Sequence, residues 1–373
     1  MILFLHHRYR SSGGEERAVE ELLWLVRERL GEDAQLLERS SATVGRARAA
    51  VGLLRGGLQP DDVAHAVRRT RARVVHAHNL HPTLGWRALA AARAAGAAVV
   101  LHLHQYRLVC AIGVCFRDGH ECLRCHGRNT LPGVVLNCRG SRPEAAAYGA
   151  GLMLWQRRLA AQADAFVVPS HFAESRLRAL GAPLGATFTV PHVVRQFAST
   201  PGVTPGGHAL LVSRLVPEKG IEVAVNACRI AGRELVIAGD GPERRRLEGD
   251  GGSVRFVGRV FDDELTQLRR SAAIALVPSL SAETFGLAAA EAMAAGLPVA
   301  ASRIGALPEL VPDEWLVPPG DPDALAVAIT RLAGDARAGQ RATELVRAVT
   351  SPDVVAPALA AVYDDAQSRR HRR

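Results

Sequence analysis

Residues 274–301 read IALVPSLSAETFGLAAAEAMAAGLPVAA and contain a strand, a helix and a second strand in one stretch. The apolar runs 274–277 and 298–301 are typical of short buried strands. Between them, small apolar residues predict a helix over 285–295 that ends at Gly296. Two short apolar strands joined by a helix indicate a βαβ unit and a parallel sheet.

The same alternation of apolar strands and helices recurs in both halves of the chain. A stretch rich in Pro, Gly, Ser and Thr, residues 198–207, interrupts it and is typical of a linker. We therefore expect two doubly wound α/β domains that bind a ligand in a cleft between them, at the carboxyl ends of their strands. The expected parts are an N-terminal domain over 1–198, a C-terminal domain over 199–350, and a final helix with a basic tail over 351–373 that packs back on the first domain.

Length and composition agree with this division and exclude several classes of protein. The chain has 373 residues, and domains typically hold about 100–200. With 48% hydrophobic and 22% charged residues it is neither disordered nor fibrous. No uncharged apolar run reaches the roughly 18–20 residues of a membrane span. The first residues lack the basic region of a signal peptide, so we expect a cytoplasmic protein.

The charge balance favours anionic partners. The formal net charge is +9, and Lys219 is the single lysine among 46 basic residues. A basic surface suits nucleotides, phospholipid surfaces or nucleic acid. We accordingly expect possible peripheral contact with the inner face of the cell membrane. A lone lysine in so arginine-rich a chain marks a position where a compact, flexible point charge is needed.

Four turns of the second half, each following a predicted strand, suggest a nucleotide site. In residues 213–220, Arg214 and Lys219 flank a loop that opens a helix, an arrangement that suits a diphosphate. A Gly-rich turn follows at 239–243, and the fourth turn is at 302–309. Glu283 lies in the turn 278–287, and Glu291 lies on an Ala-rich helix where a carboxylate needs a partner such as a sugar hydroxyl pair.

Together these turns resemble those of the retaining glycosyltransferases of family 4, which have the GT-B fold. The core of the resemblance is Glu283-x7-Glu291 followed by the Ala-Gly-Leu-Pro-Val turn, with Arg214 and Lys219 upstream. It covers nearly the whole chain. It implies two Rossmann-like domains that face a central cleft, and a sugar transferred from a UDP- or GDP-sugar to a glycan, lipid-linked or small-molecule acceptor.

The resemblance also implies a role for each matching residue. Arg214 and Lys219 would neutralise the donor diphosphate, while Glu283 would hold sugar hydroxyls and Glu291 the ribose. His104, at the end of a strand, would lie beside the donor sugar. His104, Arg214, Lys219 and Glu283 are thus the expected catalytic residues. The other expected donor-binding residues are Gly13, Gly14, Gly241, Arg259, Val260, Phe285, Gly286 and Leu287.

The implied mechanism has no protein nucleophile and no cofactor. Stabilisation of the leaving diphosphate is expected to contribute most to lowering the activation barrier. Arg214 and Lys219 can supply the positive charge that a divalent metal would otherwise bring. Three positions depart from the family pattern: Gln105 stands where relatives have Asp, Ala306 replaces the second Gly of a pair, and His192 begins the turn that is commonly Asn-Gly-Val.

Five of the six cysteines lie in an insertion over 105–143, directly after His104. Cys122 and Cys125 have the spacing that lets two thiolates hold one ion. We expect four of the five to bind a structural Zn²⁺; reduced free thiols, a disulfide or an iron–sulfur cluster remain open. The resemblance extends to a subset of the family with a cysteine-bearing insertion after the histidine strand. The five are Cys110, Cys115, Cys122, Cys125 and Cys138.

Two other functions compete with sugar transfer. The first is a nucleotide-sugar-binding or epimerising protein of the same fold, which the intact Arg214, Lys219, Glu283 and Glu291 disfavour. The second is a zinc-containing nucleic-acid-binding protein, suggested by the sequence pI of about 9.9. Only 5% of residues are aromatic and the arginines are dispersed, so no nucleic-acid partner is expected.

Overall fold

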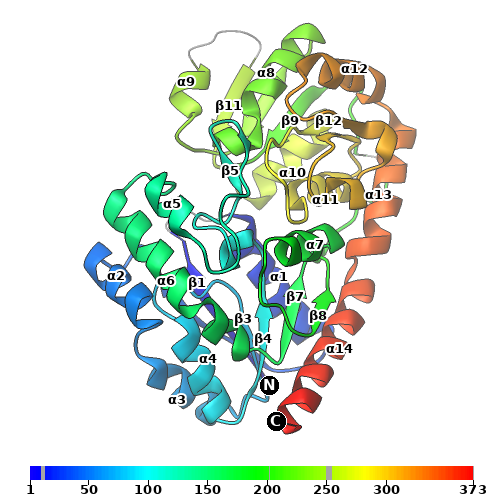
Figure 1. The fold of residues 1–373 in the computed structure, drawn as a ribbon. Coiled ribbons are helices and arrows are strands. Elements are labelled where there is room, and N and C mark those ends of the chain that lie inside the picture. The colour runs from blue at the N-terminus through cyan, green and yellow to red at the C-terminus, as the bar shows by residue number, and fades with distance from the viewer. Residues whose placement is uncertain (10–12, 201, 249–253, 373) are drawn as a thin grey trace. The chain divides into compact units, whose positions relative to one another are not determined.

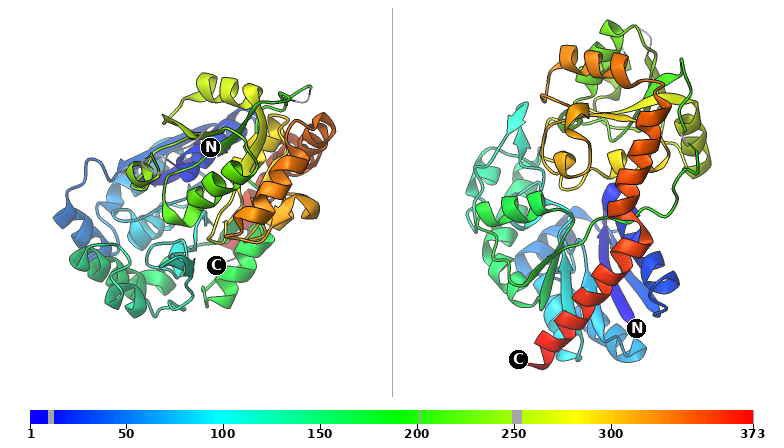
Figure 2. Two further views of the ribbon diagram at one scale, coloured as in Figure 1. Left: turned by 90° about the horizontal axis from the view of Figure 1, so that it is seen from above. Right: turned by 90° about the vertical axis from the view of Figure 1, so that its right-hand side faces the viewer.

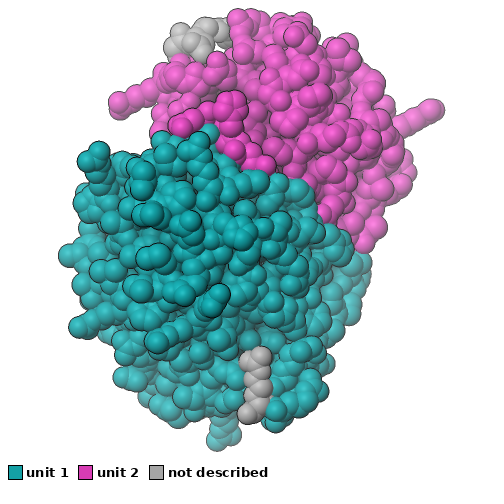
Figure 3. Space-filling model, viewed as in Figure 1, with its two compact units in different colours: residues 1–117, 122–193, 352–373 teal, residues 118–121, 194–351 magenta. Residues whose placement is uncertain are grey.

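The computed structural model describes residues 1–9, 13–200, 202–248 and 254–372. These residues form two compact units (Figures 1 and 3). Unit 1 contains residues 1–117, 122–193 and 352–373, and unit 2 contains residues 118–121 and 194–351. The main chain thus leaves unit 1 after Val193, a few residues before the expected linker.

Unit 1 is built on a six-stranded parallel sheet with helices on its faces (Figure 1). The strand order is β2-β1-β3-β4-β7-β8. The chain therefore adds β2 on one side of β1 and the later strands on the other side. The central strands are buried almost throughout because both of their faces are covered. The strands are β1 (Ile2–Arg8), β2 (Ala34–Ser40), β3 (Val74–Ala77), β4 (Ala98–His102), β7 (Ala165–Val168) and β8 (Thr187–Thr189).

The helices of unit 1 follow its strands in sequence. Helix α1 begins at Gly14, where Glu15 and Glu16 in the first turn suit the positive end of the helix dipole. Its Val19, Leu22 and Leu25 are buried in a core beneath the sheet. The helices are α1 (Gly14–Glu28), α2 (Arg46–Arg55), α3 (Pro60–Thr70), α4 (Gly85–Ala94), α5 (Leu131–Val135), α6 (Arg142–Ala161), α7 (His171–Ala179) and α14 (Pro352–His371).

Unit 2 contains a second parallel sheet with the order β11-β10-β9-β12-β13-β14. Counted from β9, this is the doubly wound order 3-2-1-4-5-6, whose switch point lies between β9 and β12. The strands are β9 (His208–Val212), β10 (Leu235–Ala238), β11 (Val254–Gly258), β12 (Ala272–Val277), β13 (Val299–Ser302) and β14 (Leu316–Val317). The helices are α8 (Ile221–Ile230), α9 (Arg244–Glu248), α10 (Asp262–Ser271), α11 (Leu287–Ala294), α12 (Pro322–Leu332) and α13 (Ala336–Thr350).

The last helix, α14, belongs to unit 1 although it follows all of unit 2 in sequence. It runs beside the strands of unit 1 (Figure 2) and buries Val355, Leu359, Val362 and Tyr363 completely. The expected frayed basic tail is helical as far as His371. By length and composition alone, the helical stretch Ala336–His371 could also cross a membrane, and 44% of its most apolar window is buried in the fold.

Candidate functional site

The switch point of unit 2 brings Lys219 and Glu283 into direct contact. Lys219 ends the short turn η2 (Pro217–Lys219) after β9, and Glu283 lies in the loop after β12. The Lys219 Nζ atom lies 2.5 Å from Glu283 Oε1, and Ser279 donates its hydroxyl hydrogen to the same oxygen at 2.6 Å. Residues that are distant in sequence therefore meet because β9 and β12 are neighbours in the sheet.

Electrostatics keep this carboxylate charged. Burial by itself raises the pKa of Glu283, but the Lys219 ammonium, the Ser279 hydroxyl and Arg214 together hold it below its usual value. The side chains of Lys219 and Glu283 are 23% and 16% exposed, so a ligand can still reach them. Arg214 is half exposed, and its guanidinium lies 3.9 Å from Glu218.

Backbone hydrogen bonds join the loops that carry these groups. The carbonyl oxygen of Glu218 accepts from Leu280 N at 2.9 Å, and the carbonyl oxygen of Glu283 accepts from Ala306 N at 2.9 Å. Gly305 adopts φ +64°, and a Cβ there would lie 2.3 Å from Glu283 N. The absence of a side chain at Gly305 lets the loop after β13 pack directly on Glu283.

Helix α11 begins beside this loop. Gly286 caps it with φ +97°, and Leu287 is its first residue, so the first backbone N–H groups of the helix have no partner within the helix. Phe285 is buried beneath them. The helix start is thus two residues later than the sequence predicts. This end of the helix can accept an anion.

Glu291 has a protein partner that sequence reasoning missed. Arg269, at the end of α10, donates from Nη2 to Glu291 Oε2 at 2.6 Å, and both side chains are nearly buried. We argued that a carboxylate on this helix needs a sugar hydroxyl pair; the structure satisfies it in part with a guanidinium. No sequence signal pairs these positions, because α10 and α11 meet only through the fold.

The remaining predicted donor residues lie on neighbouring loops of unit 2. Gly241 follows β10, and a Cβ on it would lie 2.3 Å from the carbonyl oxygen of Leu215, so the two loops pack closely. Arg259 and Val260 directly follow β11, whose last residue, Gly258, accepts a hydrogen bond from Gly239 N at 2.6 Å. All these loops stand at the carboxyl ends of the parallel strands, where such sheets bind ligands.

In unit 1, His104 belongs to a stack of buried histidines. His104 Nε2 and His78 Nδ1 are 2.8 Å apart, and the ring of His102 stacks on that of His104 with centroids 4.1 Å apart. The ring of His192 is nearly parallel to both, with its centroid 5.3 Å from that of His104 and 6.1 Å from that of His102. Burial, with the neighbouring imidazoles, lowers the pKa of His78, His102 and His104 well below the usual value, so these rings are neutral at pH 7.

This stack could have been predicted from the sequence. His76 and His78 are separated by one residue, as are His102 and His104, and β3 and β4 are adjacent strands. Alternate residues of a strand point to the same face, so two such pairs on neighbouring strands stack. Of these histidines we singled out His104 and His192 as site positions, and we missed the set as a whole.

The surroundings of Gln105 explain why an amide stands here in place of the aspartate of the family pattern. Its Nε2 donates to Glu15 Oε2 at 2.9 Å, and the hydroxyl of Tyr9 donates to the same oxygen at 3.2 Å. Burial raises the pKa of Glu15. An aspartate at residue 105 would face this carboxylate with a like charge, whereas the amide of Gln105 donates to it.

Of the predicted glycine loop, Gly13 and Gly14 are described and residues 10–12 are not. Gly13 N donates to Glu16 Oε2 at 2.7 Å, and Gly14 opens α1 at the carboxyl end of β1. The glycines thus stand where an anion could approach the backbone. A role in donor binding stays a prediction.

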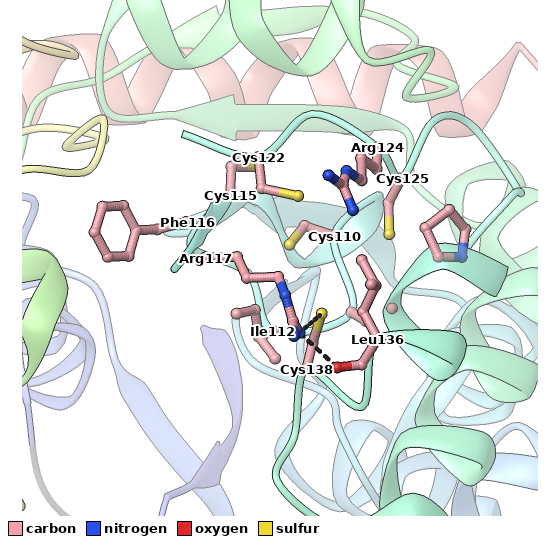
Figure 4. Close-up of a pocket in the computed structure, with 13 residues that line it drawn as sticks. Cys110, Ile112, Cys115, Phe116, Arg117, Cys122, Arg124, Cys125, Leu136 and Cys138 are labelled. Carbon is pink, nitrogen blue, oxygen red and sulfur yellow. Dashed lines mark hydrogen bonds between the residues drawn. The ribbon is translucent and has the colours of Figure 1, made fainter. Parts of the chain in front are cut away.

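The five clustered cysteines line a single pocket of unit 1 (Figure 4), and none of them forms a disulfide. The Cys115 thiol, helped by backbone N–H groups that face the Cys110 sulfur, outweighs burial and lowers the pKa of Cys110 to about 6. Burial raises the pKa of Cys125. The structure therefore brings together all five residues that the sequence predicts as metal ligands.

Two family models match almost the whole chain. The glycosyl transferase 4-like domain matches residues 4–192, and the model described as glycosyl transferases group 1 matches residues 206–335.

Among curated proteins, a GDP-mannose-dependent alpha-(1-6)-phosphatidylinositol dimannoside mannosyltransferase of Mycobacterium tuberculosis is 36% identical over 195 residues, 46% of this chain and 50% of that protein. An amylovoran biosynthesis glycosyltransferase of Erwinia amylovora is 38% identical over 142 residues, 33% of this chain and 35% of that protein. This chain thus spans half or less of the length of these relatives.

Solved structures match over the full length. Sucrose-phosphate synthase of Thermosynechococcus elongatus has a TM-score of 0.68 and 22% identity, and the match covers 97% of this chain and 98% of that one. Anabaena HepE in complex with UDP and glucose has a TM-score of 0.66 and 17% identity over 97% of this chain and 99% of that one. At these identities the likeness establishes the fold, which is GT-B.

Proposed function

The chain belongs to the glycosyltransferase family of the 4-like and group 1 domains, and from this premise we propose that it transfers a sugar from a nucleotide-diphosphate sugar with retention at the anomeric carbon. The observation that carries the proposal is the meeting of Lys219, Glu283 and Arg214 at the switch point of unit 2. It provides two cations for a diphosphate and one carboxylate for hydroxyl groups.

Each group has a defined part in the proposed reaction. As the bond between the anomeric carbon and the diphosphate oxygen breaks, negative charge accumulates on the leaving diphosphate. That charge would be stabilised by Lys219, Arg214 and the N–H groups at the start of α11. This stabilisation would contribute most to lowering the activation barrier. Glu283, already held by Lys219 and Ser279, would accept hydrogen bonds from the sugar hydroxyls.

Retention follows if the acceptor attacks on the face that the diphosphate leaves. The donor phosphate would then take the acceptor proton, and no protein nucleophile is required. Neutral His104, fixed by His78, would hydrogen-bond the donor sugar without adding a charge. The two cations also make added divalent metal unnecessary for this step.

The identity of the base is open between uracil and guanine. A relative that is 36% identical is GDP-mannose-dependent, and HepE was solved with UDP. We propose a UDP- or GDP-sugar donor and a glycan, lipid-linked or small-molecule acceptor.

Calorimetric titration with UDP, GDP and ADP tests the donor site. We expect one nucleotide to bind with a micromolar Kd and the Lys219→Ala variant to bind it about 10- to 100-fold more weakly, the loss expected for one charge-assisted hydrogen bond. Arg337→Ala, which removes an exposed cation from α13, is the matched control and should bind like wild type. A folded wild-type protein that binds none of the three would contradict the proposal.

A transfer assay separates this function from its alternative. Incubation with the donor sugar should glycosylate an acceptor, and proton NMR of the product should show the anomeric configuration of the donor. Formation of an epimeric nucleotide sugar without transfer would instead support an epimerase.

A further inference from the structure

The segment between β4 and α6 carries five cysteines and has little regular structure. Over residues 103–141 it forms a single 3₁₀ turn, the two-residue strands β5 (Phe116–Arg117) and β6 (His120–Glu121), and the five-residue helix α5. Three of its residues, Cys115, Asp118 and Asn137, adopt positive φ without being glycine. A segment of this length inside a compact unit is uncommon unless something orders it.

The cysteines come from three stretches of this segment and meet around one pocket (Figure 4). Cys110 and Cys115 come before the hairpin of β5 and β6, and Cys122 and Cys125 come after it. Cys138 follows α5. Two arginines, Arg117 and Arg124, also line the pocket. Soft thiolates from separate stretches of chain are the donor set of a structural zinc site.

We propose that this pocket holds one tetrahedral Zn²⁺ ion through the thiolates of Cys110, Cys122, Cys125 and Cys138. Cys122 and Cys125 form the two-residue-spaced pair that chelates an ion from one turn. Zinc–sulfur bonds of about 2.3 Å place tetrahedral sulfurs roughly 3.8 Å apart. No three cysteine sulfurs of the described chain lie within 4.8 Å of one another, so binding draws them inward.

Backbone geometry selects two of the ligands. The N–H groups of Ile112, Gly113 and Cys115 face the Cys110 sulfur, and those of Ala111 and Gly133 face the Cys125 sulfur. Such N–H donors hold a thiolate in place around a metal. A Cβ at residue 133 would lie 2.6 Å from the Ala111 Cβ, so Gly133 permits this approach.

Cys115 is assigned a supporting role. Its thiol contacts the Cys110 sulfur and can donate to it, which leaves the other four cysteines for a tetrahedral ion. Four thiolates and one Zn²⁺ carry a net charge of −2. Arg117 Nη1 lies 3.6 Å from Cys138 Sγ, and it offsets this charge together with Arg124.

The histidine stack is the competing metal site within the described residues. The sets His76, His78, His102 and His102, His104, His192 each have ring nitrogens within 4.8 Å of one another. The rings of His102 and His104 are only 11° from parallel. A ring nitrogen lone pair lies in the ring plane, so parallel stacked rings do not aim at a common ion. The cysteine pocket is therefore the better site.

Elemental analysis and native mass spectrometry of the full chain, purified under reducing conditions, test the proposal. We expect one zinc ion per chain, and Co²⁺ in its place should give the thiolate-to-metal charge-transfer bands of a tetrahedral sulfur site. The double variant Cys122→Ser/Cys125→Ser should lose the metal. Cys115→Ser should keep it, as should Cys228→Ser, a buried cysteine of α8 in unit 2.

If the double variant does not fold, titration of the wild-type protein with a thiol-reactive mercurial replaces it and should release one zinc ion as four thiols react. Any of four results would overturn the site: no metal on a folded, reduced protein, the absorption of an iron–sulfur cluster, loss of zinc in Cys115→Ser, or zinc that depends on His102 and not on Cys122 and Cys125. Nucleotide binding is scored separately, because Arg214, Lys219 and Glu283, which carry the proposed function, lie in unit 2.

Discussion

His192, which stands in place of a common asparagine, is one of several buried histidines that make unit 1 sensitive to acid. Burial lowers the pKa of His192 to about 4, whereas an unfolded histidine titrates near 6.5. Between these values the unfolded chain binds a proton that the folded unit does not. The free energy of unfolding is therefore highest above pH 6.5 and falls by about 1.4 kcal/mol per pH unit for each such histidine as the pH drops towards 4.

The expected result is that His192→Asn makes the pH dependence of stability shallower. Urea denaturation between pH 7 and pH 5 should show a mean slope smaller by about 1 kcal/mol per pH unit than in wild type. His65→Asn, on the exposed face of α3, is the control and should leave the slope unchanged. An unchanged slope in His192→Asn would show that this ring is already accessible to protons.

Residue types and the family resemblance pointed to candidate donor residues but not to their pairings. Lys219 and Glu283 were each predicted from their place in a turn after a strand, and the fold joins them at 2.5 Å. Arg269 was not predicted, because its contact with Glu291 depends on how α10 packs against α11. A periodic pattern shows which face of an element is buried and leaves open what that face meets.

At the scale of elements, the loops at the carboxyl ends of the strands determine the site. Gly305 illustrates the constraint, since a Cβ there would lie 2.3 Å from Glu283 N and 2.5 Å from Glu283 O. Gly305→Ala should displace the Glu283 loop. We expect destabilisation of about 1–3 kcal/mol beyond the strain of the positive φ and at least tenfold weaker nucleotide binding, measured by urea denaturation and calorimetry.

Gly232→Ala provides the matched control for this change. Gly232 has φ +62°, close to the +64° of Gly305, but a Cβ there would meet nothing within 4 Å. Gly232→Ala should therefore lower the free energy of unfolding by about 1–2 kcal/mol, the cost of a left-handed backbone at a non-glycine residue. Its nucleotide binding should be normal. Equal effects of the two variants on binding would remove the steric argument for Gly305.

The elements themselves follow from local sequence, with boundaries that shift for physical reasons. The sequence predicts a helix from residue 219, and the structure begins α8 at Ile221 because Gly220 turns left-handed at φ +64°. The segment 103–141 was recognisable only as an insertion, since it has few periodic apolar positions. Its short strands and its cysteine pocket depend on contacts between residues that are distant in sequence.

At the scale of the whole molecule, the chain returns to its first unit at the end. Helix α14 carries Leu359 and Tyr363, both fully buried in unit 1, and the Tyr363 hydroxyl lies 2.9 Å from His76 Nδ1. The sequence predicted a final helix and could not fix its register, because its apolar residues are interrupted by Pro357. Unit 1 therefore includes a helix that follows all of unit 2 in sequence.

This closure predicts that one substitution in α14 destabilises unit 1 and spares unit 2. Leu359→Ala removes a side chain buried in the core with β1, β3, β4 and β7, so we expect a loss of about 2–5 kcal/mol in unfolding free energy. Val354→Ala, on the same helix and 41% exposed, should cost much less. Urea denaturation followed by hydrogen exchange assigns the loss to a unit: amides of β3 and β4 should lose protection, whereas those of β9 and β12 should keep it. Equal loss of protection in both sheets would mean that the two units unfold as one.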